Sequence, residues 1–230
     1  MGEDFQEVTR INRAVRQKGP AEFLKRSRDY WTLWVYKESD ELDELPQVLK
    51  DLYRRSLLIL RTQIDNAGGI IAANDFDFTH YGHDTYSYMW PRDGALVAAS
   101  LIEASYSEIA RRFFDFCHRV ITPEGFLLHK YNPDGSLASS WDGWYHDGVK
   151  QLPIQEDETA LVVWALWRHF RRFRDIEFVK RHYRGLIIRA ANWLAAYRDP
   201  QSGLPLPSWD LWEERRGSSL GRWRRRGRDC

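Results

Sequence analysis

The sequence has little cysteine and no long apolar segment. Two of its 230 residues are cysteines, Cys117 and Cys230, and two cysteines cannot form a disulfide framework. No run of about eighteen apolar residues occurs, which argues against a membrane-spanning helix, and Met1–Phe5 does not have the pattern of a signal peptide. These absences predict a soluble chain in a reducing, cytoplasmic compartment.

An excess of charge of one sign is also missing. Lys and Arg total 34 and Asp and Glu total 33, so the formal net charge is +1 at pH 7. Without a dominant charge, the chain has no field that would attract nucleic acid or an anionic membrane, and neither is expected as a partner. A metal site is an alternative, but the spacing of its candidates is loose, and we expect no metal or other cofactor. Those candidates are His80, His83, Asp84, His146 and Asp147.

Aromatic residues are abundant, at 14% of the chain with 11 tryptophans. Chains rich in tryptophan often bind sugars or pack large helical cores, and composition does not distinguish these two cases. The length favours a single domain.

Two kinds of helix alternate along the chain. Segments 95–104 and 160–170 are apolar almost all round, which predicts buried helices. Each is followed by an amphipathic segment, 107–120 with Ser107 as its expected cap and then 176–197. The alternation is typical of paired inner and outer helices, so we predict an all-α fold, a partial (α/α)6 toroid.

The rest of the chain divides around this body. Residues 1–43 are predicted to form a helical connector that is broken at Gly19-Pro20. Residues 44–217 are predicted to form the partial toroid. Within it, 126–136 is expected to form a small projecting β-hairpin. The tail, 218–230, is rich in arginine and glycine and has no apolar periodicity. It fits either a basic nucleic-acid-binding arm or translation in a wrong frame, and we favour the second because the tail interrupts a predicted helix.

Carboxylates and indole rings gather near the end of the chain. Asp210, Glu213 and Glu214 lie among Trp209 and Trp212. Apolar neighbours and like charges both raise the pKa of a carboxyl, so one acid here could stay protonated and donate a proton to a sugar oxygen. The same spacing allows Asp210 and Glu213 to form a capping box at a helix start, and the two interpretations are compatible.

Three polar and aromatic clusters, 80–93, 141–157 and 208–214, each come just before an inner-type helix or at its start. We expect them to converge on one pocket. Glu156 and Glu158 lie in or beside the second cluster and are interpreted as acids that favour the positive end of a helix dipole. Likewise, the arginines of 168–174 are interpreted as a solvated helix end rather than a basic patch.

The motifs Tyr86–Asp93, Gln151–Ala160 and Pro207–Arg216 together resemble glycoside hydrolase family 15, which holds glucoamylases, glucodextranases and some microbial trehalases. Each motif alone is weak, but three in the family's order and spacing are specific, and the similarity covers most of residues 5–217. The resemblance implies an (α/α)6 barrel, often preceded by a β-sandwich domain. It also implies inverting hydrolysis that releases glucose from non-reducing ends of α-glucans.

The resemblance also implies roles for particular residues. It assigns the general acid to Glu213 and the hold on the terminal glucose to Arg92 and Asp93. It places the other residues of the sugar pocket at Tyr88, Trp90, Asp210, Trp212 and Glu214.

Two departures limit what the resemblance implies. We expect these 230 residues to include neither the β-sandwich nor the second half of the barrel, which holds the family's general base. Inversion needs an acid and a base about 6.5–9.5 Å apart with water between them. We therefore expect a truncated N-terminal half of the catalytic domain, inactive alone and prone to self-association through uncovered apolar faces. Its expected ligand is an α-glucan or trehalose. A trehalase on the same scaffold and a non-catalytic, carbohydrate-binding or unstable fragment are the alternatives.

Overall fold

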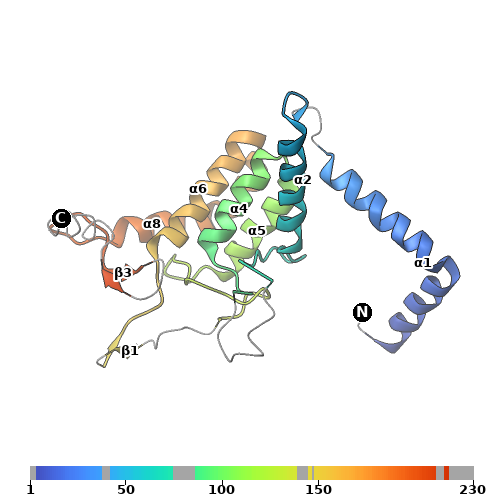
Figure 1. The fold of residues 1–230 in the computed structure, drawn as a ribbon. Coiled ribbons are helices and arrows are strands. Elements are labelled where there is room, and N and C mark those ends of the chain that lie inside the picture. Colours follow the sequence, from blue (N-terminus) through green and yellow to red (C-terminus); the bar gives the residue numbers. More distant parts are fainter. Residues whose placement is uncertain are drawn as a thin grey trace. The chain divides into compact units, whose positions relative to one another are not determined.

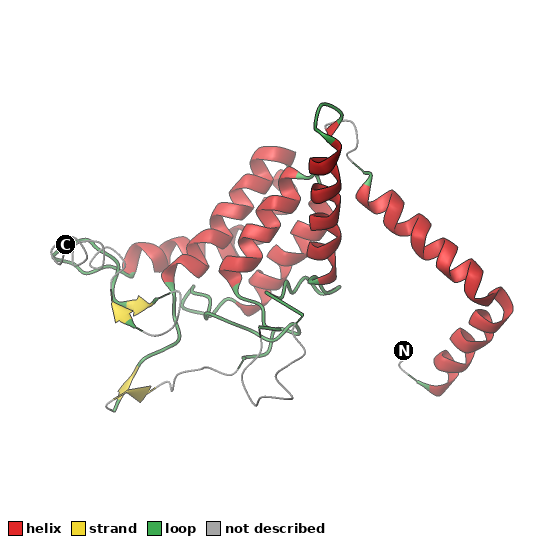
Figure 2. Ribbon diagram, viewed as in Figure 1, coloured by secondary structure: helices red, strands yellow, loops and turns green. Residues whose placement is uncertain are grey.

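The structure is a computed structural model that describes residues 4–37, 42–74, 86–138, 145–146, 148–210 and 215–217. The described residues are mainly helical (Figures 1 and 2). They fall into two compact units, Met1–Ile59 and Leu60–Cys230, which are treated separately below. No helix of the described residues is both long enough and apolar enough to cross a bilayer.

The first unit consists of helix α1, Phe5–Val35, and most of helix α2, Gln47–Thr62. The side chain of Asp4 caps α1 by accepting a hydrogen bond from the amide of Glu7 at 2.8 Å. The helix is kinked at Gly19, whose φ of 75° lies in the left-handed region that glycine adopts readily. The predicted break at this position is therefore confirmed.

The second unit is a bundle in which α4 packs on α5 and α6, and α7, η2 and α8 pack on α5, α6 and one another. The unit contains α4 Pro91–Glu103, α5 Ser107–Val120, α6 Glu156–Phe173, α7 Ile176–His182, the π-helix η2 Tyr183–Ile187 and α8 Ile188–Ala196. Helix α4 packs between α5 and α6, as Figure 1 shows. Gly94 allows the close approach to α5, because a Cβ atom there would lie 2.4 Å from Cε2 of Phe113. The predicted all-α fold is confirmed.

Helices α4 and α6 run parallel, since the same ends of both meet. Arg92 contacts Glu158 at their N-terminal ends, and Arg168 forms an ion pair with Glu103 near their C-terminal ends. Both helices were predicted to be buried, and each has an extensive buried face, but each also keeps an exposed side. Trp167 of α6 remains 48% exposed, and α4 likewise keeps one half-exposed leucine.

The β structure differs from the prediction for 126–136. No paired strands form there: only isolated bridges join Tyr131 to Met89 and to Leu137. Nor does the segment project, because Leu127 and Tyr131 are buried and the amide of Leu127 donates to Oγ1 of Thr159 in α6 at 2.9 Å. This long-range bond holds the segment against the helical body.

Two small antiparallel pairs of strands occur elsewhere. Strand β1, Tyr145–His146, pairs with β2, Val149–Lys150. Strand β3, Ser208–Trp209, pairs with β4, Arg216–Gly217. The second pair lies next to the start of α6 and belongs to the site described below.

Two helix details also differ from the predictions. The cap of α5 is Tyr106 rather than Ser107. The Ser107 hydroxyl instead lies 3.0 Å from Nε2 of His169, and this hydrogen bond joins α5 to α6. The predicted helix over 176–197 is present, but it contains the π-helix η2 around Gly185, where a Cβ atom would lie 2.0 Å from Nε2 of His118.

Candidate active site

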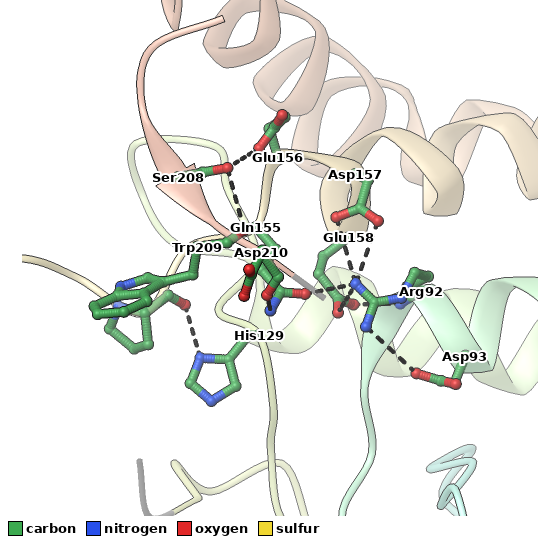
Figure 3. Close-up of polar contacts among 11 residues, drawn as sticks. Arg92, Asp93, His129, Gln155, Glu156, Asp157, Glu158, Ser208, Trp209 and Asp210 are labelled. Carbon is green, nitrogen blue, oxygen red and sulfur yellow. Dashed lines mark hydrogen bonds and ion pairs between the residues drawn. The ribbon is translucent and has the colours of Figure 1, made fainter. Parts of the chain in front are cut away.

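The candidate site is built where the N-terminal ends of α4 and α6 meet (Figure 3). Pro91 occupies the start of α4, where its fixed φ suits the first turn and its missing N–H costs nothing. Arg92 and Asp93 follow in the same turn. The first turn of α6 carries three acids in succession, Glu156, Asp157 and Glu158. Negative charge is favourable at this positive end of the helix dipole.

The guanidinium of Arg92 is held from several sides. Its Nη1 atom lies 2.5 Å from Oε1 of Gln155, 3.2 Å from Oδ2 of Asp157 and 3.1 Å from Oε1 of Glu158. Its Nη2 atom lies 4.0 Å from Oδ2 of Asp93. Burial alone would lower the pKa of Arg92, but the charges of Glu158, Asp157 and Asp93 outweigh burial and raise it. Arg92 is therefore a fixed cation.

Glu158 is fully buried, with no exposed side-chain surface. Its Oε2 atom accepts a hydrogen bond from the backbone N–H of Arg92. Since the capping residue of α4, Trp90, makes no side-chain cap bond, Glu158 caps α4 from the neighbouring helix. Burial raises the pKa of Glu158 well above its usual range, although the Arg92 charge and N–H act in the opposite direction.

The interpretation of Glu158 as a simple dipole partner is thus incomplete. A sequence signal for its burial does exist. Glu158 lies four and eight residues before Val162 and Leu166, on the buried face of α6. A carboxylate on that face needs a partner, and Arg92 supplies it.

Gln155 connects Arg92 to strand β3. Its Oε1 accepts from Arg92, and its Nε2 donates to the backbone carbonyl of Asp210 at 2.7 Å. Two more contacts hold the same strand: the amide of Trp209 donates to the carbonyl of Ile154, in the loop before α6, at 3.0 Å, and the hydroxyl of Ser208 donates to Glu156 in α6. The described parts of the three clusters therefore meet, while the pocket on which they were expected to converge stays a prediction.

The predicted helix start at Asp210 is wrong. The amide of Asp210 donates to the carbonyl of Arg215 at 2.9 Å, and β3 pairs with β4 on the far side of residues 211–214. This pairing closes a hairpin at the position where the capping box would have begun a helix. Trp212, Glu213 and Glu214 lie outside the described residues.

The residues weighed above as an alternative metal site fall largely outside the described residues as well. His80, His83, Asp84 and Asp147 lie outside the described residues, and only the backbone of His146 is described. In the ranges that the structure does describe, no three side chains that bind metals gather.

The aromatic residues Tyr86, Tyr88 and Trp90, which precede Arg92 in the sequence, form a cluster of contacting rings. Trp90 is only 4% exposed, and its ring centroid lies 5.9 Å from those of Tyr86 and Tyr88. Lys130, which the sequence analysis did not single out, is buried with its Nζ atom 4.7 Å from the Tyr88 centroid. Trp90 is therefore buried among aromatic rings, while Tyr88 is half-buried.

His129 ties the segment beside this cluster to the loop before α6. Both its backbone N–H and its Nδ1 atom lie 3.0 Å from the carbonyl of Pro153. Burial lowers the pKa of His129 to about 4, so the ring is neutral at physiological pH.

Comparison with known proteins identifies the family to which these features belong. The family model described as glycosyl hydrolases family 15 matches residues 47–220. The chain belongs to glycosyl hydrolase family 15. The predicted family is therefore confirmed, and Arg92, Gln155 and Asp210 all lie inside the matched region.

One relative of this family 15 chain is an uncharacterized glycosyl hydrolase of Methanocaldococcus jannaschii. The two are 32% identical over 165 residues, which cover 71% of this chain and 23% of that protein. Among solved structures, a glycosidase variant matches with a TM-score of 0.54 at 23% identity, and another variant, in complex with glucose, with a TM-score of 0.51 at 24% identity. Each match covers 72% of this chain and 43% of the solved chain, so the likeness concerns the fold of less than half of those proteins.

Proposed function

We propose that this chain carries the sugar-holding side of an inverting, exo-acting α-glucoside hydrolase of the glucoamylase type, with Glu213 as its general acid. The observation that carries the proposal is the clamp of Arg92 by Gln155, Asp157 and Glu158 beside the β3–β4 hairpin. In the sequence, Glu213 belongs to the residues that join β3 to β4. Membership of family 15 supports this assignment of roles.

The chemistry of the clamp suits a sugar. Asp93 keeps 47% of its side chain exposed, and 4.0 Å to Arg92 is too long for a hydrogen bond, so its oxygens can accept from sugar hydroxyls. Arg92 carries five N–H donors in a rigid fork and is only 17% exposed. A fixed donor next to an accessible acceptor is what a pair of neighbouring hydroxyl groups requires.

We expect the chain alone to bind a glucoside without turning it over. Inversion requires a second carboxylate to activate water, and the family resemblance assigns no residue of these 230 to that role. The chain matches only 43% of the solved glycosidases. The substrate of the whole enzyme, an α-glucan or trehalose, would thus bind Arg92 and Asp93 through its terminal glucose.

Ligand binding tests the proposal. Saturation-transfer NMR with maltose, isomaltose, trehalose and, as the β-linked comparison, cellobiose should show transfer to the α-glucosides only. Asp93→Asn should abolish transfer, whereas Asp29→Asn, an exposed change in α1, should leave it unchanged. Absence of transfer to all three α-glucosides would refute the proposed function.

A glucose-release assay tests the expected lack of turnover. Maltotriose and trehalose should yield no glucose above the rate with Glu213→Gln. Release that Glu213→Gln abolishes would show that a general base is present after all. Release that Glu213→Gln does not alter would come from a contaminating hydrolase.

A further inference from the structure

Gln155 occupies an unusual place for a residue at a helix start. It is the capping residue of α6, but its side chain makes no cap bond. The residue is 1% exposed, and its side-chain amide forms hydrogen bonds with Arg92 at 2.5 Å and with the carbonyl of Asp210 at 2.7 Å. Figure 3 shows the side chain lying between these two residues.

The two contacts require an amide. A guanidinium only donates hydrogen bonds and a backbone carbonyl only accepts them. One orientation of the Gln155 amide satisfies both, with Oε1 toward Arg92 and Nε2 toward Asp210. A carboxylate would keep the first bond and oppose the second, and an apolar side chain would lose both.

These contacts join segments that are far apart in the sequence. Arg92 lies 63 residues before Gln155, and Asp210 lies 55 residues after it. Trp209 and Ser208 fasten the hairpin to the loop before α6 and to α6, but those contacts do not involve Arg92. Gln155 is bonded both to the arginine and to the hairpin.

We infer that Gln155 is a positioning residue that couples Arg92 to the β3–β4 hairpin. It would hold the guanidinium of Arg92, which binds the sugar, in a fixed position relative to the hairpin. The inference rests on the proposed function in taking Arg92 as the residue that holds the sugar. It goes beyond that function by assigning a separate residue to the alignment of the two parts of the site. Such alignment matters because small displacements of positioned groups reduce catalysis strongly.

Hydrogen exchange of the free protein tests the coupling. Gln155→Glu keeps the acceptor for Arg92 and removes the donor to Asp210, and Gln155→Met removes both. In both variants the amides of Trp209 and Asp210 should exchange roughly three- to tenfold faster, the range expected for one lost hydrogen bond. Gln201→Glu, a matched change in an exposed turn, should leave them within about twofold.

A second measurement separates coupling from simple stability. The Arg92 guanidinium signal in ¹⁵N NMR should stay near its wild-type position in Gln155→Glu and shift in Gln155→Met. Maltose should slow exchange of the Asp210 amide in the wild-type chain, but it should bind Gln155→Glu without slowing that exchange.

Three results would overturn the inference. The first is unchanged exchange of the hairpin amides in Gln155→Glu. The second is equal acceleration across α5 and the hairpin, which would mean a general loss of stability. The third is maltose protection of the hairpin that persists in Gln155→Glu. If maltose binds no form of the protein, the proposed function fails, while the comparison without ligand still decides the role of Gln155.

Discussion

Replacing Glu158 with glutamine should change how the stability of this protein depends on pH. Glu158 is fully buried, and burial raises its pKa well above the usual 4.5. The folded protein therefore keeps a proton on Glu158 at pH values where the unfolded chain has released it. A glutamine side chain has a similar shape and does not titrate, so Glu158→Gln isolates this proton.

The sign and size of the effect follow from linkage. Above about pH 4.5 the folded state binds more protons at Glu158 than the unfolded state, so this group makes the free energy of unfolding fall as pH rises. One proton gives a slope of at most about 1.4 kcal/mol per pH unit. The loss continues until the pH reaches the raised pKa of the folded state. A constant difference between the two proteins, from altered contacts with Arg92, does not affect the slope.

The assay is urea unfolding of both proteins at intervals from pH 4 to pH 8, followed by tryptophan fluorescence. The free energy of unfolding of the wild type minus that of Glu158→Gln should decline with pH from about 4.5 upward. Two protein concentrations should be compared, since association would shift the midpoints. Glu177→Gln, at a side chain 76% exposed in α7, should give a flat difference within about 0.5 kcal/mol.

A difference that does not fall with pH above about 4.5 would refute the reasoning. If the ion pair with Arg92 at 3.1 Å outweighed burial, the pKa of Glu158 would be lowered rather than raised. The difference between wild type and Glu158→Gln would then increase only up to about pH 4.5 and stay level from there to about pH 8. Glu158 would be an ordinary buried ion-pair partner rather than a carboxyl kept protonated by its surroundings.

Three further predictions concern packing, acid sensitivity and assembly. Gly94→Ala should lower the free energy of unfolding in the same urea assay by about 1–3 kcal/mol, because the new Cβ atom would lie 2.4 Å from the Phe113 ring. Gly217 has open space around it, so the control Gly217→Ala should change the free energy of unfolding by less than about 0.5 kcal/mol. Burial lowers the pKa of His169 to about 4, so the free energy of unfolding should fall as pH drops from 6.5 toward 4. His169→Phe should remove this part of the fall, and an unchanged dependence of stability on acid pH in the variant would contradict the prediction. The apolar side chains exposed on α1 and α2 should drive self-association, and light scattering that gives the mass of one chain at all concentrations would exclude it.

Local patterns predicted most of the helical elements. The apolar runs at 95–104 and 160–170 largely coincide with α4 and α6, and Gly19 breaks α1 as expected. Helix α4 begins at Pro91, four residues before the apolar run, because proline is favoured in the first turn of a helix. These features depend on neighbours within a few residues, and so they can be recognised in the sequence.

The features that were missed depend on distant residues. The hairpin at Asp210 replaces a locally plausible capping box because Ser208 pairs with Gly217 across the intervening residues. The burial of Glu158 depends on Arg92, more than sixty residues earlier in the chain, and Gln155 bonds both to Arg92 and to Asp210, 55 residues later. No pattern within one helix conveys such contacts. The three motifs predicted which loops would meet, but not which side chains would join them.

The capping of α4 by a neighbouring helix has a consequence for how the protein folds. The acceptor for the Arg92 N–H comes from Glu158, 66 residues further along the chain. That bond cannot form until the intervening segment has closed into a loop, and its loss of conformational entropy must be overcome first. The first turn of α4 should therefore be completed late in folding and open early in native-state fluctuations. The end of these helices that carries Arg92 and Glu158 is then the part whose order depends most on the intervening segment being folded.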